Sequence, residues 1–126
     1  MILLFLYVLI FIALSSFSIT ILGDRAILSS DLSSLNGILG LFVNWKIYLA
    51  VVLAILARIS FTLINIQLYK IPLTSNNSTN IASLLSNTAI FGVLITNYFF
   101  LGEVLTIKQG IGMVFILIGV LFILIN

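Results

Sequence analysis

Apolar residues gather into four long runs along the chain, and more polar stretches separate them. The runs cover about 1–22, 47–69, 80–100 and 109–125. A helix needs about 20 apolar residues, with a range of about 17 to 25, to cross the hydrocarbon core of a bilayer. The pattern therefore predicts an all-α, polytopic membrane protein, in which a single domain, 1–126, contributes four transmembrane helices.

The stretch 23–46 is the longest connection between these runs. Gly23-Asp24 ends the first run, and Trp45 beside Lys46 suits the headgroup region. The apolar residues between them fall near helical spacing: Leu32, Leu35, Ile38, Leu39 and Phe42. We therefore expect a short amphipathic helix at the membrane interface between the first two spans.

Composition strengthens this picture and removes several functions. The 126 residues are 63% hydrophobic and 6% charged, whereas soluble proteins carry about 25% charged residues. There is no cysteine and no histidine, and the three carboxylates, Asp24, Asp31 and Glu103, lie outside the predicted spans. We therefore expect no enzyme, no catalytic residue, no metal site and no cofactor. The five basic residues are too scattered to predict nucleic acid binding.

The exception to this apolar pattern is Arg58, near the middle of the second span. An arginine at a helix centre costs about 3 kcal/mol on insertion scales, so it usually faces a cavity or a partner. Ala54, Thr62 and Asn65 share its helix face. This stripe needs protein or water beside it, and we expect the rest of the chain to supply that cover. With Asn87 of the third span, Arg58, Thr62 and Asn65 form the predicted substrate-binding site.

Three interpretations of Arg58 stay open. Its guanidinium suits a phosphate or carboxylate of a substrate, because its planar fork can bind either group with two hydrogen bonds. It could instead pair with a carboxylate on a partner protein, which would make the chain a scaffold or accessory subunit. In the third interpretation it bonds only loose carbonyls and serines between helices.

Small and hydroxyl residues suggest where helices pack closely. Gly112 and Gly119 stack on one face of the fourth span, and packing within the chain and between chains are equally open. The hydroxyl residues at the end of the first span could serve packing or face a substrate: Ser15, Ser16, Ser18 and Thr20. Glu103, in the turn before the fourth span, is expected to cap backbone N–H groups of that helix.

The stretch 99–123 resembles the final helix pair of the drug/metabolite transporter superfamily, in particular its EamA-like domain. The matching residues are Gly102-Glu103, Leu105-Thr106, Gln109 to Gly112, and Gly119. The four-span length is similar to that of the half-size members, which include small multidrug resistance proteins and lipid-linked aminoarabinose flippase subunits. The Gly112/Gly119 spacing looks like the last-helix dimer contact of the multidrug group. The resemblance is good over the last 50 residues or so and only positional before them.

The resemblance implies a half-size transporter or flippase subunit in the cell membrane, working as a homodimer or as a heterodimer with a similar four-helix protein. The multidrug group has a glutamate in the first span that binds proton and drug, but this chain has Ser15 and Ser16 at that depth. Proton-coupled export of cations is therefore disfavoured. With Arg58 in the second span, an anionic or lipid-phosphate-linked substrate is expected; the alternative is a non-transporting scaffold of another membrane protein.

Overall fold

The computed structural model describes residues 2–30 and 33–125, with 120, 121 and 123–125 described by their backbone alone. Within this part the chain is helical and has no strand. The elements are α1 (Ile2–Leu22), α2 (Arg25–Leu28), α3 (Leu35–Val43), α4 (Trp45–Tyr69), the short 3-10 helix η1 (Ser75–Asn77), α5 (Ser78–Asn87), α6 (Ala89–Leu101) and α7 (Ile107–Ile125). The all-α prediction is confirmed for the described residues.

Three helical segments are long and apolar enough to cross a membrane: Ile2–Leu22, Trp45–Tyr69 and Ser75–Leu101. The described apolar part of α7, Ile107–Gly119, is shorter. The predicted limits of the first, second and fourth spans agree closely with α1, α4 and α7. The predicted third span, 80–100, lies within Ser75–Leu101, and the structure adds an interruption of the helix at Thr88 between α5 and α6.

The connection between α1 and α4 carries two short helices where one was expected. α3 matches the expected interfacial helix, and its apolar side chains Leu35, Leu39 and Phe42 are exposed. Leu32 and Asp31 lie outside the described residues. Each short helix has a side-chain cap: Asp24 accepts from the Ala26 N–H, and Ser34 accepts from the Gly37 N–H.

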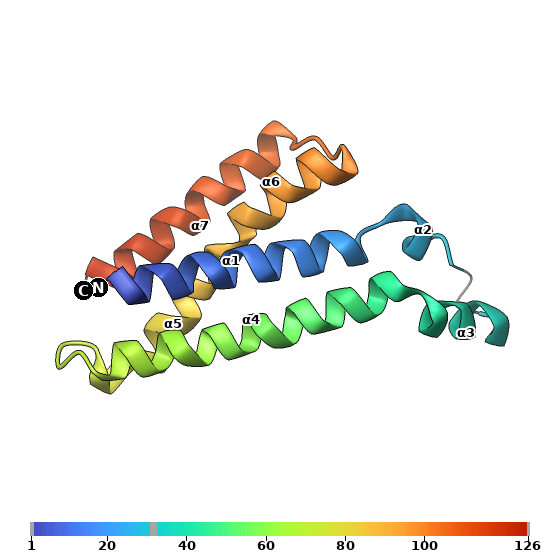
Figure 1. Cartoon of the computed structure of the whole chain (residues 1–126). Helices are drawn as coiled ribbons and strands as arrows, with labels where there is room; N and C mark the ends of the chain where they lie inside the picture. The colour runs from blue at the N-terminus through green and yellow to red at the C-terminus, as the bar shows by residue number, and fades with distance from the viewer. Residues whose placement is uncertain (1, 31–32, 126) are drawn as a thin grey trace.

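The centre of the fold is the antiparallel pair of α1 and α4, which lie side by side along most of their length (Figure 1). The α4 residues turned toward this core are mostly small: Ala50, Ala57, Ser60, Ile64 and Leu68. Small residues let transmembrane helices approach closely. Phe11 of α1 and Phe61 of α4 fill the remaining space, with ring centroids 6.3 Å apart. α5 covers α4, and α6 crosses α1.

Polarity is inverted relative to a soluble protein. The buried polar residues are hydroxyls, Ser16, Ser18, Thr20, Ser60 and Ser78, whereas many large apolar side chains are exposed. Phe115 is 69% exposed and Phe122 is 74% exposed. A chain whose apolar side chains point outward along helices of this length is suited to lipid as its solvent.

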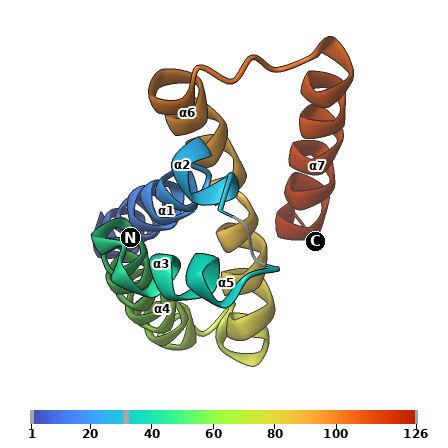
Figure 2. The same ribbon diagram turned by 90° about the vertical axis from the view of Figure 1, so that its right-hand side faces the viewer.

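α7 stands apart from the other helices, and an extended stretch after α6 carries the chain to it (Figure 2). Gly102 ends α6 with φ +66°, a left-handed conformation that favours glycine. No described atom lies within 4 Å of where a Cβ would stand on Gly112 or Gly119. Packing of these two glycines within the chain is therefore not observed among the described residues, and a contact between chains stays a prediction.

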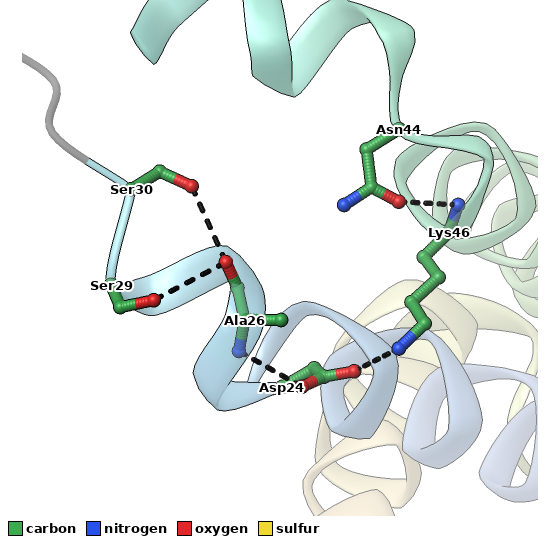
Figure 3. Close-up of polar contacts among 6 residues, drawn as sticks. All are labelled: Asp24, Ala26, Ser29, Ser30, Asn44 and Lys46. Atoms are coloured by element: carbon green, nitrogen blue, oxygen red, sulfur yellow. Dashed lines mark hydrogen bonds and ion pairs between the residues drawn. The ribbon is translucent and has the colours of Figure 1, made fainter.

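An ion pair ties the end of α1 to the start of α4. Figure 3 shows the Lys46 ammonium donating to the Asp24 carboxylate, while the other carboxylate oxygen accepts from the Ala26 N–H. Asn44 caps α4 by accepting from the Lys46 N–H at 3.0 Å. The hydrogen bond from Lys46, followed by the one from Ala26, lowers the pKa of Asp24 below its ordinary value of 3.8.

This lowered pKa predicts an acid-sensitive contact. A carboxylate with a depressed pKa stabilises the fold above its unfolded pKa of about 4, and this contribution is lost as the pH falls through the folded value. Thermal unfolding in detergent between pH 7 and pH 2 should therefore show a larger acid loss in the wild type than in Asp24→Asn. Lys46→Met should fall between the two, because Asp24 keeps its hydrogen bond from the Ala26 N–H. Parallel curves for all three proteins would contradict the assignment.

The α1–α6 crossing depends on Gly92. A Cβ on Gly92 would lie 2.2 Å from Ser16 Oγ and 2.7 Å from Ile12 Cγ2. Gly92→Ala should therefore lower the free energy of unfolding by about 1–3 kcal/mol, as overpacking does. Gly110→Ala is the matched control, because nothing lies within 4 Å of its Cβ position, and helix propensity favours alanine there by up to about 1 kcal/mol. Equal unfolding temperatures for the two variants would refute the crossing.

Candidate functional site

The break between α5 and α6 arises from a run of residues that compete with the helix. Three hydroxyls donate back to carbonyls of their own helix: Ser83 to Thr79 O at 2.9 Å, Ser86 to Ser83 O at 2.6 Å, and Thr88 to Leu85 O at 2.5 Å. Such bonds offer the backbone an alternative to the regular helical ladder. At the break the N–H groups of Thr88 and Phe91 bond three residues back, the tighter 3-10 pattern.

A groove of about 380 Å³ lies where this break meets α1 and α4. Apolar side chains, including Phe11 and Ile90, form most of its wall. The polar residues lining it come from three parts of the fold: Ser15 and Ser18 from α1, Arg58 from α4, and Ser86 and Asn87 from the end of α5. Arg58 and Asn87, which are far apart in the sequence, are therefore brought to one groove.

Arg58 is exposed at the rim of this groove, close to the middle of α4. Within the described part of the chain its guanidinium makes no hydrogen bond and no ion pair. Ala54 and Thr62 on the same face are exposed as well. The rest of the chain therefore covers this stripe only in part: Ala54 and Arg58 line the groove, whereas Thr62 does not. The face of α4 that packs inward is the one with Ala57 and Ser60, next to Arg58 in the sequence.

The other three predicted site residues, Asn87, Thr62 and Asn65, do not lie in one place. Asn87 is exposed and lines the groove with Arg58. Thr62 donates to the Arg58 carbonyl of its own helix at 3.1 Å and does not line the groove. Asn65 lies in a separate cavity nearer the end of α4, where its amide nitrogen donates to Thr79 Oγ1 at 3.1 Å. The structure thus groups two of the four predicted residues.

The hydroxyl residues of α1 include one that bonds a neighbouring helix and two that line the groove. Ser18 Oγ donates to Ala50 O of α4 at 2.8 Å, and Ser16 Oγ donates to Ile12 O in its own helix at 2.6 Å. The first bond joins α1 to α4, whereas the second stays within α1. Ser15 and Ser18 also line the groove, so part of the row faces the candidate site.

A hydrogen-bonded chain that sequence reasoning missed joins α1 to the turn before α7. Thr20, which is 4% exposed, lies 2.6 Å from Thr96 Oγ1 and donates to Asn97 Oδ1 at 2.7 Å. The amide nitrogen of Asn97 then donates to a carboxylate oxygen of Glu103 at 3.1 Å. The signal was an asparagine near the end of an apolar span, which needs partners for its amide.

The cap of α7 differs from the prediction. Thr106 and Gln109 form a reciprocal pair: Gln109 Oε1 accepts from the Thr106 N–H at 2.9 Å, and Thr106 Oγ1 accepts from the Gln109 N–H at 3.4 Å. This is the capping box expected of a threonine followed three residues later by glutamine. Glu103 instead binds Asn97, so its predicted capping of α7 is not observed among the described contacts.

No protein-family model, no curated protein and no solved structure matches the chain significantly. The resemblance to the drug/metabolite transporter superfamily therefore rests on the quoted residues of 99–123 alone. It remains a prediction, and so do the activity, the partner and the substrate that it implies.

Because Thr20 bonds residues of another helix, removing its hydroxyl should lower the free energy of unfolding more than removing an exposed hydroxyl. Thr20→Val removes the donor to Asn97 and leaves a part-buried amide oxygen unpaired, so it should cost about 1–2 kcal/mol of unfolding free energy. Thr62→Val is the matched control, because that hydroxyl is exposed and bonds only its own helix; its cost should stay within about 0.5 kcal/mol. Equal losses in chemical unfolding would argue against the Thr20 chain.

Proposed function

We propose that the chain is a half-size transporter or flippase subunit of the drug/metabolite transporter type, with four membrane crossings in the cell membrane. Its substrate is an anionic or lipid-phosphate-linked small molecule. Arg58 binds the negative charge, and Asn87 supplies a hydrogen bond from the same groove. The observation that carries this proposal is the position of Arg58, an arginine at mid-span that lines a groove without a carboxylate among the described residues.

The charge balance of the groove supports an anion. The whole stretch 47–102 contains Arg58 and Lys70 and no aspartate or glutamate. A guanidinium in a poorly hydrated groove is stabilised by a ligand that brings a negative charge, and phosphate matches its two-pronged geometry. The neighbouring serine and asparagine side chains add neutral hydrogen-bonding groups without opposing that charge.

The broken helix also supports a transport site. In a membrane, irregular backbone at mid-depth is tolerated where it is buried in protein or lines a water-filled cavity. Transporters commonly bind substrates and ions at the ends of such half-helices, because these ends carry unpaired backbone groups and partial charges. Ser86, Asn87 and Ala89, which flank the break at Thr88, all line the groove with Arg58.

The exposed side of the groove is the reason to propose a dimer. Ala54, Arg58 and Thr62 are exposed, although Ala54 and Arg58 also line the groove beside α1. A charged stripe at this depth is costly against lipid, so a second subunit, identical or similar, is proposed to close it. Gly112 and Gly119 of α7 offer a second surface for that contact, because no described atom approaches them.

A flipping assay in vesicles tests the role of Arg58. The probe is a short fluorescent polyprenyl phosphate, and the matching polyprenyl alcohol controls for the tail. Arg58→Ala should lower the flipping rate of the phosphate at least tenfold, and Arg58→Lys should retain part of it, because lysine keeps the charge but loses the planar fork. Arg25→Ala is the matched arginine control, since Arg25 is exposed in α2.

Unchanged flipping in both Arg58 variants would remove Arg58 from the site. The scaffold alternative draws on the same exposed stripe, which could meet a carboxylate of a different membrane protein. Obligate co-purification with such a protein, lost in Arg58→Ala, would favour the scaffold over the transporter. A purified homodimer that flips the probe would exclude the scaffold.

A further inference from the structure

A second cavity, of about 520 Å³, lies where α4 ends and α5 begins. Its walls are the last turns of α4, the 3-10 helix η1 and the first turn of α5. It shares no lining residue with the groove at Arg58. Its volume lies within the range of about 300–1,000 Å³ that is typical of ligand sites. We call it the Lys70 cavity, after the one charged residue that lines it.

The Lys70 cavity is rich in hydrogen-bond donors that have no partner. The side chains of Lys70, Asn76, Asn77 and Asn80 line it, and none of the four makes a hydrogen bond or ion pair within the described part of the chain. Lysine contributes three N–H donors, and each asparagine contributes two. All four side chains are exposed, and no carboxylate of the described residues lines the cavity, so the charge of its described lining is positive.

Asn65, which also lines the cavity, has one side-chain atom without a hydrogen-bond partner. Its Oδ1 is buried and has no partner, although the other end of the amide binds Thr79. Reversing the amide would satisfy the oxygen and leave the NH2 group unpaired instead. In either orientation one polar atom of Asn65 lacks a bond, and a buried polar group without one is costly unless a water or ligand completes it.

The position of the Lys70 cavity in the fold suggests which anion reaches it. Tyr69 and Lys70 end a 25-residue apolar helix, and tyrosine and lysine at such a helix end lie at headgroup depth. Lipid phosphates occupy the same depth. The cap residue of α5, Asn77, makes no side-chain hydrogen bond to the first turn, so backbone N–H groups there are also free of a side-chain acceptor.

We propose that the Lys70 cavity is a binding site for a phosphate mono- or diester, supplied by a lipid headgroup. Lys70 provides the charge, Asn76, Asn77 and Asn80 provide neutral donors, and the apolar surface beside Ile66 and Tyr69 faces the acyl region. The site does not depend on Arg58 or on transport, since its residues lie outside the Arg58 groove.

The test is lipid retention by the purified full chain in detergent, measured by native mass spectrometry. Phosphatidic acid and diacylglycerol with the same acyl chains are the two lipid probes, and inorganic phosphate is the competitor. Lys70→Ala should weaken phosphatidic acid retention about tenfold, because a charge-assisted hydrogen bond is lost. Asn80→Ala should weaken it less. Lys108→Ala is the matched control, since Lys108 is exposed at the start of α7, away from the cavity.

Each outcome of this experiment either supports or overturns phosphate binding in the Lys70 cavity. Equal losses in Lys70→Ala and Lys108→Ala would indicate general attraction of lipid to lysines and overturn the site. Diacylglycerol retained as tightly as phosphatidic acid would overturn the phosphate recognition. Binding of inorganic phosphate without retention of phosphatidic acid would support the phosphate chemistry and identify the free ion as its source. In an Arg58→Ala background, Lys70→Ala should still cause the same further loss of phosphatidic acid retention, so failure of the transport proposal is separable from failure here.

Discussion

A polar group inside hydrocarbon needs a hydrogen-bonding partner. Some polar residues of this chain find that partner within the described structure, and others do not. The buried hydroxyls satisfy it in the simplest way, because Ser18 bonds an α4 carbonyl and Thr20 bonds Thr96 and Asn97 across helices. Arg58 does not satisfy it within the described chain. The same requirement that explains the α1–α4 and α1–α6 contacts therefore marks Arg58 as a mid-span residue that needs a partner from outside the described chain.

Small residues make these contacts possible. Ala50 and Ala57 on α4 and Gly92 on α6 let the backbones of their helices come close to α1. Because small residues fill the helix contacts, the core is thin, and its largest fully buried side chains are Ile64 and Ser16. A helical chain with so thin a core encloses little volume, so its grooves open on the surface. Ligand sites that need walls on every side then require a second subunit, which agrees with the proposed dimer.

The sequence predicted the lengths of the helices well, because hydropathy and chain length alone decide how much helix crosses hydrocarbon. It did not predict the break at Thr88, since hydropathy averages over Ser86, Asn87 and Thr88 and periodicity does not register hydroxyls that bond their own backbone. It also placed Arg58, Thr62 and Asn65 in one site. Helical spacing shows which residues share a face, but the neighbouring helix decides which of them meet, and here it separates Asn65 from Arg58.

The two proposed anion sites lie at different positions along α4, Arg58 near its middle and Lys70 at its end. Asn65 and Arg58 lie seven residues apart on one face of α4, or about 10 Å along the helix. In the proposed Lys70 site the donors are exposed, so water competes with an anion for each of them. At Arg58 the charge is less hydrated, and the same anion gains more from pairing because the interaction is stronger at low dielectric. A phosphate-bearing molecule that meets both residues would bind first where access is easy and more tightly where the membrane is driest.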